Sequence, residues 1–158
     1  MTAPSESSRS LVTAVFLLHV LATLTMFGVI WIVQVVHYPL FSGVGAEEWR
    51  AYSAGHQWRI TLIVGPAMVL ELATAVWLVL DRPAAFPAWA VLAGLGAVGV
   101  IWSATALFSV PAHNALSASW DAEAHARLVS SNWVRTLAWT FRAGLVLWFT
   151  ALALNRGL

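Results

Sequence analysis

The sequence predicts an all-α protein that crosses a membrane four times, and three observations lead to this fold class. First, hydrophobic residues make up 60% of the 158 residues and charged residues only 9%, whereas soluble domains carry about 25% charged residues. Second, four apolar stretches reach the roughly 20 residues that a helix needs to cross the hydrocarbon core. Third, most charged residues lie between these stretches. We therefore expect a four-transmembrane-helix bundle with both termini on one side.

The four predicted spans differ in the charges they contain. The first and third carry no Asp, Glu, Lys or Arg, whereas Glu71 lies deep in the second and Arg142 lies deep in the fourth. The apolar run of the first span exceeds the ~7–15 residues of a secretory signal core, so we expect it to be retained. Residues 1–10 form a polar tail, and residues 11–158 form a single membrane domain. The predicted spans are residues 11–36, 58–80, 86–110 and 132–154.

The connections between the spans are predicted to differ in structure. Asp81 to Pro83 is typical of a short turn between the second and third spans. Residues 46–52 and 121–128 each resemble a short interfacial helix with acidic residues in its first turn, where the helix dipole favours them. Ser119 is the candidate N-cap of the second of these short helices.

The two halves of the chain resemble each other, which indicates two duplicated helical hairpins. A shift of 75 residues aligns Trp58 with Trp133, and a shift of 76 aligns His37 with His113. Matches of this number also arise by chance, so a bundle without internal duplication is the alternative. If the duplication holds, we expect the functional site to lie between the halves.

The composition excludes several classes of function. The chain has no cysteine, which excludes thiol catalysis, disulfide bonds and iron–sulfur ligation. Its net charge is +1 and it has no phosphate-binding glycine motif, so no nucleic-acid partner is expected. The arginines divide almost evenly between the two sides of the predicted bundle. If Arg59 and Arg135 belong to a site rather than to a loop, the remaining arginines favour cytoplasmic termini by a small margin.

Three ionisable residues, Glu71, Arg142 and His19, lie deep within the predicted spans. A charge at such a depth costs at least a few kcal/mol unless it is paired or hydrated. Glu71 is within reach of either Arg142 or His19, and the sequence leaves both pairings open. We interpret the group either as a buried ion pair that fixes helix register or as part of a proton path.

Polar side chains gather at the ends of the four predicted spans on the side away from the termini. One stripe of the fourth span has helical spacing and is expected to face inward. We therefore predict a polar pocket with its mouth at this membrane face, and the alternative is a ring of interfacial groups with snorkelling arginines. The stripe consists of Asn132, Arg135, Thr136, Trp139 and Arg142. The other residues at the mouth are Gln34, His37, Tyr38, His56, Arg59, His113 and Asn114.

The histidines of this predicted pocket raise the question of a cofactor. His37, His56 and His113 could bind zinc, copper or iron through imidazole nitrogens, or a haem near the mouth. No neighbouring carboxylate and no His-x-x-x-His pair supports a metal site. We assign no cofactor, and haem or a histidine-bound metal is the alternative.

Two segments at the predicted pocket carry a family resemblance. They are Pro-Ala-His-Asn-Ala-Leu at residues 111–116 and Asn-Trp-Val-Arg-Thr at residues 132–136, accompanied by His-Tyr-Pro at residues 37–39. From about Trp31 to Arg142 the chain resembles the anthrone-oxygenase-like family of small four-helix integral membrane proteins. The resemblance implies a multi-pass protein of the bacterial inner membrane. A fungal branch of that family is implicated in the oxygenation of anthrones to anthraquinones without an evident cofactor, and the resemblance implies the same class of reaction here.

Residue chemistry suggests roles in such a reaction. A base would remove a proton from a phenolic carbon acid, and His37, His56 and His113 are the candidates because imidazole titrates near neutral pH. Asn132 and Arg135 would stabilise the developing oxyanion. The candidates for binding the substrate are Gln34, Tyr38, Arg59, Asn114 and Trp139.

The resulting expectation is a membrane-embedded, oxygenase-like enzyme whose partners are the lipid bilayer and an apolar aromatic or quinone-like small molecule. Three alternatives stay open. They are a non-catalytic membrane subunit that binds a partner protein, a haem-binding or metal-binding membrane protein, and a proton-coupled carrier. The sequence also leaves open whether the chain forms a homo-oligomer.

Overall fold

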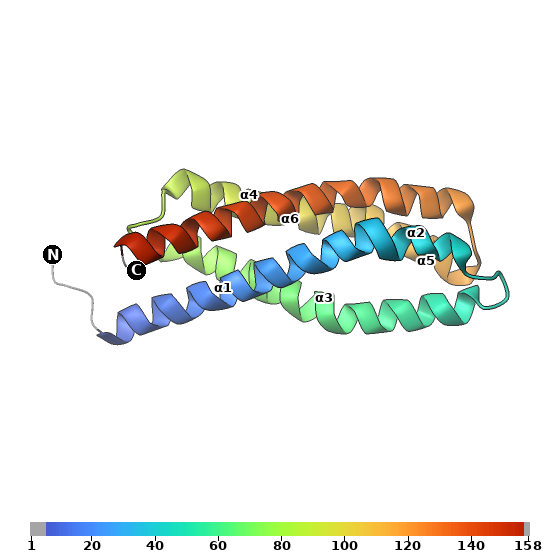
Figure 1. The fold of residues 1–158 in the computed structure, drawn as a ribbon, viewed down its shortest axis with the longest axis horizontal. Helices are drawn as coiled ribbons and strands as arrows, with labels where there is room; N and C mark the ends of the chain where they lie inside the picture. Colours follow the sequence, from blue (N-terminus) through green and yellow to red (C-terminus); the bar gives the residue numbers. More distant parts are fainter. Residues whose placement is uncertain (1–5, 157–158) are drawn as a thin grey trace.

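The structure is a computed structural model that describes residues 6–156, and these residues form a bundle of long helices without a strand (Figure 1). The all-α fold predicted from the sequence is therefore confirmed. Two short segments, η1 and η3, are π-helical, and η2 is a 3-10 turn. In chain order the elements are α1 (Glu6–Ile32), η1 (Val33–His37), α2 (Tyr38–Leu40), η2 (Phe41–Gly43), α3 (Trp49–Leu80), α4 (Ala88–Ala104), η3 (Thr105–Ser109), α5 (Val110–Ala118) and α6 (Ala122–Arg156).

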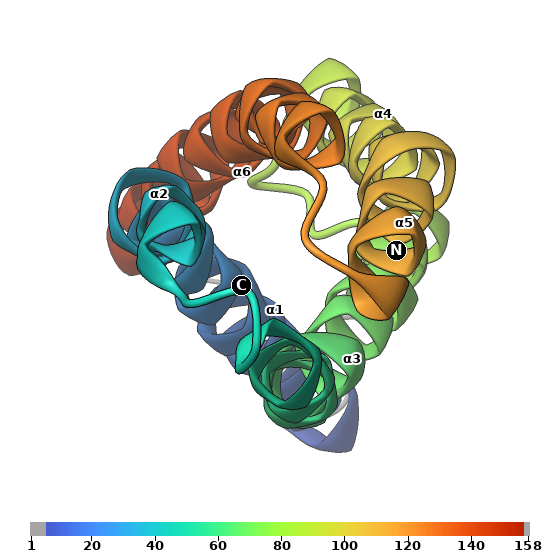
Figure 2. The same ribbon diagram turned by 90° about the vertical axis from the view of Figure 1, so that its right-hand side faces the viewer.

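These elements combine into four rods, each long and apolar enough to cross a membrane. α1 packs against α3 and α6, and α4 also packs against α3 and α6, so the rods stand at the four corners of a square (Figure 2). The beginning of α1 and the end of α6 lie at the same end of the bundle. By length and composition the chain is a multi-pass integral membrane protein. The four rods cover Arg9–Gly43, Trp49–Leu80, Ala88–Ala118 and Ala122–Asn155.

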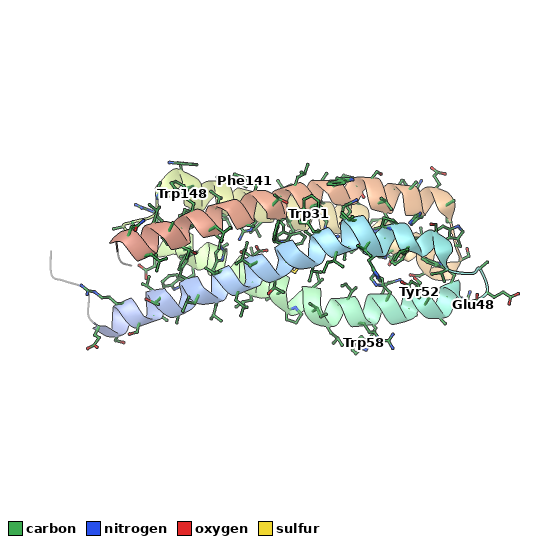
Figure 3. The ribbon with its side chains drawn as sticks, in the orientation of Figure 1. Trp31, Glu48, Tyr52, Trp58, Phe141 and Trp148 are labelled. Atoms are coloured by element: carbon green, nitrogen blue, oxygen red, sulfur yellow. The ribbon has the colours of Figure 1, made fainter. Side chains whose placement is uncertain are left out.

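The outer surface of the bundle is apolar, as a lipid environment requires. Trp58 points away from the bundle (Figure 3), and Trp58, Leu62 and Leu147 are more than half exposed. Soluble monomers rarely expose apolar surface on this scale. The exposed side chains therefore suit contact with acyl chains.

The two short interfacial helices expected at residues 46–52 and 121–128 are not separate elements. Trp49 begins α3, and the second segment forms the first turns of α6. No proline interrupts α3 before Pro66, and α6 contains none. The helices α3 and α6 therefore continue without a break through the segments that were predicted to be separate connecting helices.

Both π-helical segments precede a proline by the same spacing. η1 ends at His37 and is followed by Tyr38 and Pro39, while η3 ends at Ser109 and is followed by Val110 and Pro111. Proline inside a helix lacks an N–H group, and its ring collides with the carbonyl four residues earlier. A π turn adds one residue to the helix and rearranges those carbonyls, so it accommodates the proline. It also turns every later side chain by about 100° relative to a continuous α-helix.

The shared spacing bears on the predicted duplication, because it relates the two hairpins by structure as well as by sequence. If the π turns are equivalent, Ser109 occupies the position of His37, and His113 occupies that of Phe41. The alignment of His37 with His113 therefore differs from the register of the π turns by four residues. The duplication itself stays a prediction.

Asp121, the residue before α6, caps this helix, whereas the sequence suggested Ser119 as the cap. Its carboxylate accepts hydrogen bonds from the backbone N–H groups of Ala124 (3.0 Å) and Glu123 (2.9 Å). Ser119 instead follows the last residue of α5 in an extended conformation. An aspartate at this position satisfies backbone donors that a helix leaves without partners.

These hydrogen bonds, chiefly the one from Ala124, hold the pKa of the Asp121 carboxyl below its ordinary value. The cap therefore stabilises the fold fully above the ordinary aspartate pKa, and this stabilisation is lost as the pH falls through the lowered pKa. We expect Asp121→Ala to lower the thermal unfolding midpoint in detergent, by an amount that shrinks below the ordinary aspartate pKa. Asp121→Asn keeps an acceptor and is the control. A difference between wild type and Asp121→Ala that does not change with pH would contradict the assignment.

Candidate functional site

A cavity of ≈ 190 Å³ lies inside the half of the bundle away from the termini. It is bounded by all four rods and combines apolar walls with a few polar groups. The volume is below the ~300–1,000 Å³ of sites for drug-sized ligands, so it suits a compact molecule. The lining residues on which the argument depends are Val29, Val33, Tyr38, Ile60, Thr61, Ser109, Val110, His113, Asn114 and Arg135.

Tyr38 and His113 form the hydrogen-bonded pair of this cavity. The Tyr38 hydroxyl lies 3.0 Å from Nε2 of His113, and both side chains line the wall. Tyr38 is 4% exposed. Its backbone carbonyl accepts a hydrogen bond from Nε2 of His125 at 2.8 Å. When the phenol donates to Nε2, the remaining proton of a neutral His113 is on Nδ1. The pair thus presents a proton acceptor and a rotatable hydroxyl to a bound molecule.

Arg135 supplies a positive charge to the same cavity. Its guanidinium donates to the Ser109 hydroxyl at 2.8 Å and lies 5.4 Å from the ring centroid of Trp139. The residue is 6% exposed, and its buried Nε has no hydrogen-bond partner. A desolvated cation–π contact contributes about 2 kcal/mol, whereas burying a charge costs several kcal/mol. The contact with Trp139 therefore does not offset the burial of this charge.

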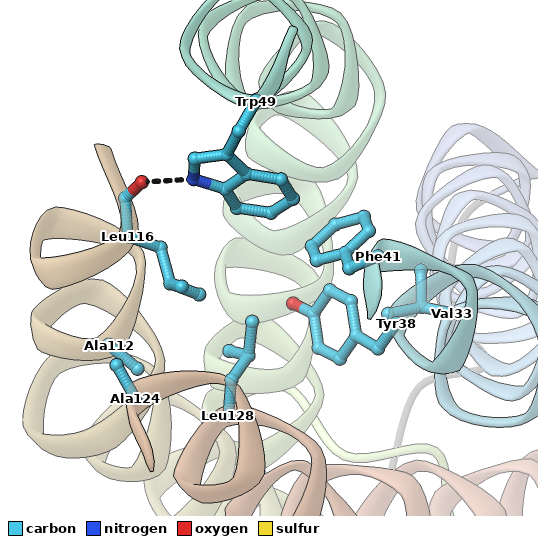
Figure 4. Close-up of a cluster of buried hydrophobic side chains, with 8 residues drawn as sticks. All are labelled: Val33, Tyr38, Phe41, Trp49, Ala112, Leu116, Ala124 and Leu128. Atoms are coloured by element: carbon cyan, nitrogen blue, oxygen red, sulfur yellow. Dashed lines mark hydrogen bonds between the residues drawn. The ribbon is translucent and has the colours of Figure 1, made fainter. Parts of the chain in front are cut away.

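An apolar cluster closes the end of the bundle where the sequence predicted a mouth. Tyr38, Phe41, Trp49, Leu116 and Leu128 are buried there together (Figure 4), and the Trp49 indole donates to the Leu116 carbonyl at 2.6 Å. The aromatic rings come from residues 38–49, whereas Leu116 and Leu128 come from α5 and α6, which is why no single stretch of sequence revealed this cluster.

The cavity instead reaches the surface sideways, between α3 and α5. Among its lining residues Thr61, Val110 and Asn114 are exposed. α3 is about 48 Å long, so each end extends about 9 Å beyond a hydrocarbon core of ~30 Å when the helix is centred in the bilayer. Thr61 is about 18 Å from the start of α3 by the same rise per residue. Asn114 is about 6 Å from the end of its rod by the same measure, so in this placement the opening extends from the headgroup level into the level of the acyl chains.

His37 and His56 face a different space from His113. His37 Nε2 lies 2.8 Å from His56 Nδ1, and both line a separate hollow of ≈ 350 Å³ together with Arg59. Nε2 of His56 is buried without a partner, and the rings of His56 and His113 have centroids 5.7 Å apart. The three predicted bases are therefore neighbours, but only His113 lines the cavity that contains Arg135.

Gln34 and Asn132 are committed to each other rather than to the cavity. Asn132 Nδ2 donates to Gln34 Oε1 at 2.9 Å, and the Thr136 hydroxyl donates to the same oxygen at 3.3 Å. Gln34 Nε2 donates to the Val129 carbonyl at 3.2 Å. These bonds tie η1 to α6. Neither residue lines the cavity. The geometry therefore does not support the role predicted for Asn132 in oxyanion stabilisation or the role predicted for Gln34 in substrate binding.

The fourth-span stripe does face inward, since all five of its residues are buried, yet it serves two separate sites. Arg135 faces the cavity, whereas Trp139 is fully buried outside it and donates from Nε1 to Glu71 Oε2 at 2.9 Å. The structure therefore does not bring Trp139 to the cavity as a substrate-binding residue. Arg59 also lies outside it, so Tyr38 and Asn114 are the members of that predicted set that line the cavity.

Deeper in the bundle, Glu71 pairs with Arg142. Nε of Arg142 lies 2.8 Å from Oε1 of Glu71, and both side chains are 2% exposed. Arg142 also donates to the Gly94 carbonyl on α4 and to Thr23 on α1. Residues of all four rods therefore meet at this one guanidinium.

His19 completes this deep centre without carrying a charge. Its Nε2 lies 3.2 Å from Arg142, which can only donate, so Nε2 must accept. Its Nδ1 then carries the proton and donates to the Thr74 hydroxyl at 2.8 Å, and Thr74 donates to the Leu70 carbonyl at 2.7 Å. The adjoining hollow measures ≈ 10 Å³, about the space of a single water. This geometry favours the buried-pair interpretation over a hydrated proton path.

The geometry of the histidines also bears on the metal alternative. Within residues 6–156 no group of three or more His, Cys, Asp or Glu side chains is placed to hold a metal ion. Nε2 of His37 and Nδ1 of His56 already share a hydrogen bond. The Nε2 atom of His113 likewise bonds to Tyr38. These residues therefore do not form a common ligand set in this arrangement.

Sequence reasoning missed several residues that complete the two centres. Ser109, the partner of Arg135, stands four residues before His113, a spacing that places both on one helical face. Thr74 stands three residues after Glu71 and was detectable by the same signal. Gly94 acts through its backbone carbonyl, for which the sequence carries no signal.

Comparison of the chain with known protein families, characterised proteins and solved structures finds no match.

Proposed function

We propose that this membrane protein is an oxygenase that converts the activated methylene group of a compact aromatic ketone, such as an anthrone, into a carbonyl. One observation carries the proposal: a His113–Tyr38 pair and the guanidinium of Arg135 line a single apolar cavity. The resemblance of residues 111–116 and 132–136 to the anthrone-oxygenase-like family supports the same class of reaction. His113 and Arg135 belong to these two segments.

The first step is proton transfer from carbon. Nε2 of His113 takes a proton from the methylene group when the Tyr38 hydroxyl rotates toward the substrate. The electron pair of the broken C–H bond moves into the conjugated ring system and places negative charge on the ketone oxygen. Arg135, anchored by Ser109, stabilises this oxyanion. A positioned base contributes typically 10²–10⁴-fold to such a step.

The resulting anion is electron-rich enough to react with dioxygen. A C–O bond forms at the former methylene carbon, and the protonated His113 returns its proton to give a hydroperoxide. Loss of the second C–H proton then breaks the O–O bond and releases water. The net reaction is R₂CH₂ + O₂ → R₂C=O + H₂O, in which the carbon loses four electrons and dioxygen accepts them.

The sideways opening supports a substrate that dissolves in the bilayer. The exposed residues of the opening lie on α3 and α5 and reach from the headgroup level to the depth of the acyl chains, and the apolar cluster covers the end of the bundle. A ring system dissolved in lipid therefore reaches His113 without passing through water.

The test is oxygen consumption by the purified protein in lipid nanodiscs supplied with 1,8-dihydroxyanthrone. We expect uptake above that of empty nanodiscs, with one anthraquinone formed for each O₂ consumed. Anthrones also oxidise spontaneously, so the empty nanodiscs and heat-denatured protein set the baseline. Uptake at the baseline rate across a panel of anthrones and quinols would reject the proposal.

A further inference from the structure

The described part of the chain has one more buried positive charge than its buried acids can balance. Glu71 is the one acidic side chain among residues 6–156 that is buried, and it is bound to Arg142. Ion pairs in this range are Arg142 with Glu71 and, on the surface, Arg127 with Glu123. Arg135 therefore has no carboxylate within ion-pair distance.

The groups around Arg135 do not replace a counter-ion. The Ser109 hydroxyl, the nearby Tyr38 phenol and the face of Trp139 are neutral, and Nε of Arg135 has no hydrogen-bond partner. The guanidinium cannot lose its charge in a protein. The guanidinium charge of Arg135, which lines the cavity and has no counter-ion among the described residues, points to a group that the cavity receives.

We propose that the cavity binds its ligand as an organic anion, with the ionised oxygen against Arg135 and the apolar body between α1 and α3. This inference rests on the proposed function only because both use the same cavity, and it assigns the ligand's charge. Val29, Val33 and Ile60 supply the apolar wall, while Ser109 and Arg135 supply the polar end. The ligand class is a compact aromatic phenolate or carboxylate.

The negative charge of the ligand follows from the buried positive charge of Arg135. A neutral ligand would displace water from Arg135 and leave the guanidinium without compensation in a low-dielectric site. An anion restores neutrality to the cavity, and a charge-assisted hydrogen bond to a guanidinium is stronger than a neutral one. The cavity is therefore expected to discriminate by charge between ligands of one shape.

Binding is tested with two inert probes of similar shape, 2-naphthoate and 2-naphthalenemethanol. They are titrated by calorimetry into the full-length protein in nanodiscs of zwitterionic lipid under anaerobic conditions. We expect 2-naphthoate to bind with one site per chain and at least tenfold more tightly than the alcohol. Equal affinities for the two probes, or tighter binding of the alcohol, would overturn the proposal.

Two arginine variants locate the charge that is responsible. Arg135→Gln is expected to remove the tenfold preference, whereas Arg59→Gln, which removes an exposed arginine of the other hollow, is expected to keep it. Preference that survives Arg135→Gln, or that disappears in Arg59→Gln, would contradict the assignment. Arg135→Lys keeps a charge in the cavity and is expected to keep the preference to within a few-fold. If Arg135→Gln does not fold, Arg135→Lys is the variant that is measured in its place.

The two proposals fail separately. The probes have no activated methylene group and dioxygen is absent, so binding is measured without turnover. Selective binding of 2-naphthoate together with no oxygen uptake from anthrones would reject the oxygenase alone. Oxygen uptake together with no charge preference would reject the anion site alone.

Discussion

Replacing His113 by glutamine is expected to lower the rate of anthrone-dependent oxygen uptake by about 100-fold or more, the contribution of a positioned general base. His113 is the histidine that lines the cavity, and its Nε2 faces the Tyr38 hydroxyl at 3.0 Å. Glutamine has a similar reach but cannot take up a proton at neutral pH. The measurement is oxygen consumption per folded protein, with the folded fraction determined by size-exclusion chromatography and thermal unfolding.

His37→Gln provides the matched control for this prediction. His37 is bonded to His56 and faces the other hollow, so its loss is expected to change the rate only a few-fold. Tyr38→Phe removes the hydroxyl but keeps the ring in the apolar cluster, and a decrease of intermediate size is expected. Should His37→Gln reduce the rate as much as His113→Gln, the base would belong to the His37–His56 pair.

The change Glu71→Gln is expected to reduce the free energy of unfolding by about 3–5 kcal/mol, the typical cost of removing one partner from a buried ion pair. Glu71 and Arg142 are 2% exposed and 2.8 Å apart, so the substitution leaves the Arg142 charge without its counter-ion. The measurement is chemical or thermal unfolding in detergent followed by tryptophan fluorescence.

A double-mutant cycle separates the pair from its surroundings. Glu71→Gln combined with Arg142→Met is expected to cost less than the sum of the single changes, because no unpaired charge remains. The exposed pair of Glu123 and Arg127 is the control, since surface pairs at this helical spacing contribute about 0.3–0.5 kcal/mol. Additive costs at the buried pair would show that Glu71 and Arg142 do not stabilise each other.

The same variant distinguishes a structural centre from a proton path. The glutamine amide still offers an oxygen to the Trp139 indole, so the contact between Trp139 and Arg135 is retained. Oxygen uptake by the folded fraction of Glu71→Gln is therefore expected to stay within a few-fold of wild type. A loss of rate equal to that of His113→Gln would show that Glu71 takes part in the reaction.

Much of the architecture was predictable because it depends on local properties of the chain. The four spans follow from uninterrupted apolar stretches, and the inward stripe of α6 follows from helical spacing. The cost of burying charge likewise indicated that Glu71 and Arg142 need partners. The structure supplied the specific pairing, and it added Thr23, Thr74 and Gly94 from three different helices.

The candidate site was less predictable because two π-helical turns, η1 and η3, changed the directions of the side chains that follow them. The π turns before Pro39 and Pro111 rotate the residues that follow them, so Gln34 and Tyr38, four residues apart, do not share the face that a continuous α-helix would give them. Gln34 contacts Asn132, whereas Tyr38 contacts His113. The spacing of polar residues therefore gathered these side chains at one end of the bundle, but it did not separate the residues that line the cavity from those that bond to each other outside it.

What the sequence by itself determined is the four-span topology and the need for a polar interior, since apolar length and the cost of buried charge are properties of each segment alone. Only the tertiary structure decided which polar groups share a cavity and where that cavity opens. Tyr38, His113 and Arg135 come from three rods, and the apolar cluster around Trp49 is likewise assembled from several segments. Such meetings depend on how helices pack and turn against one another, which no single segment encodes.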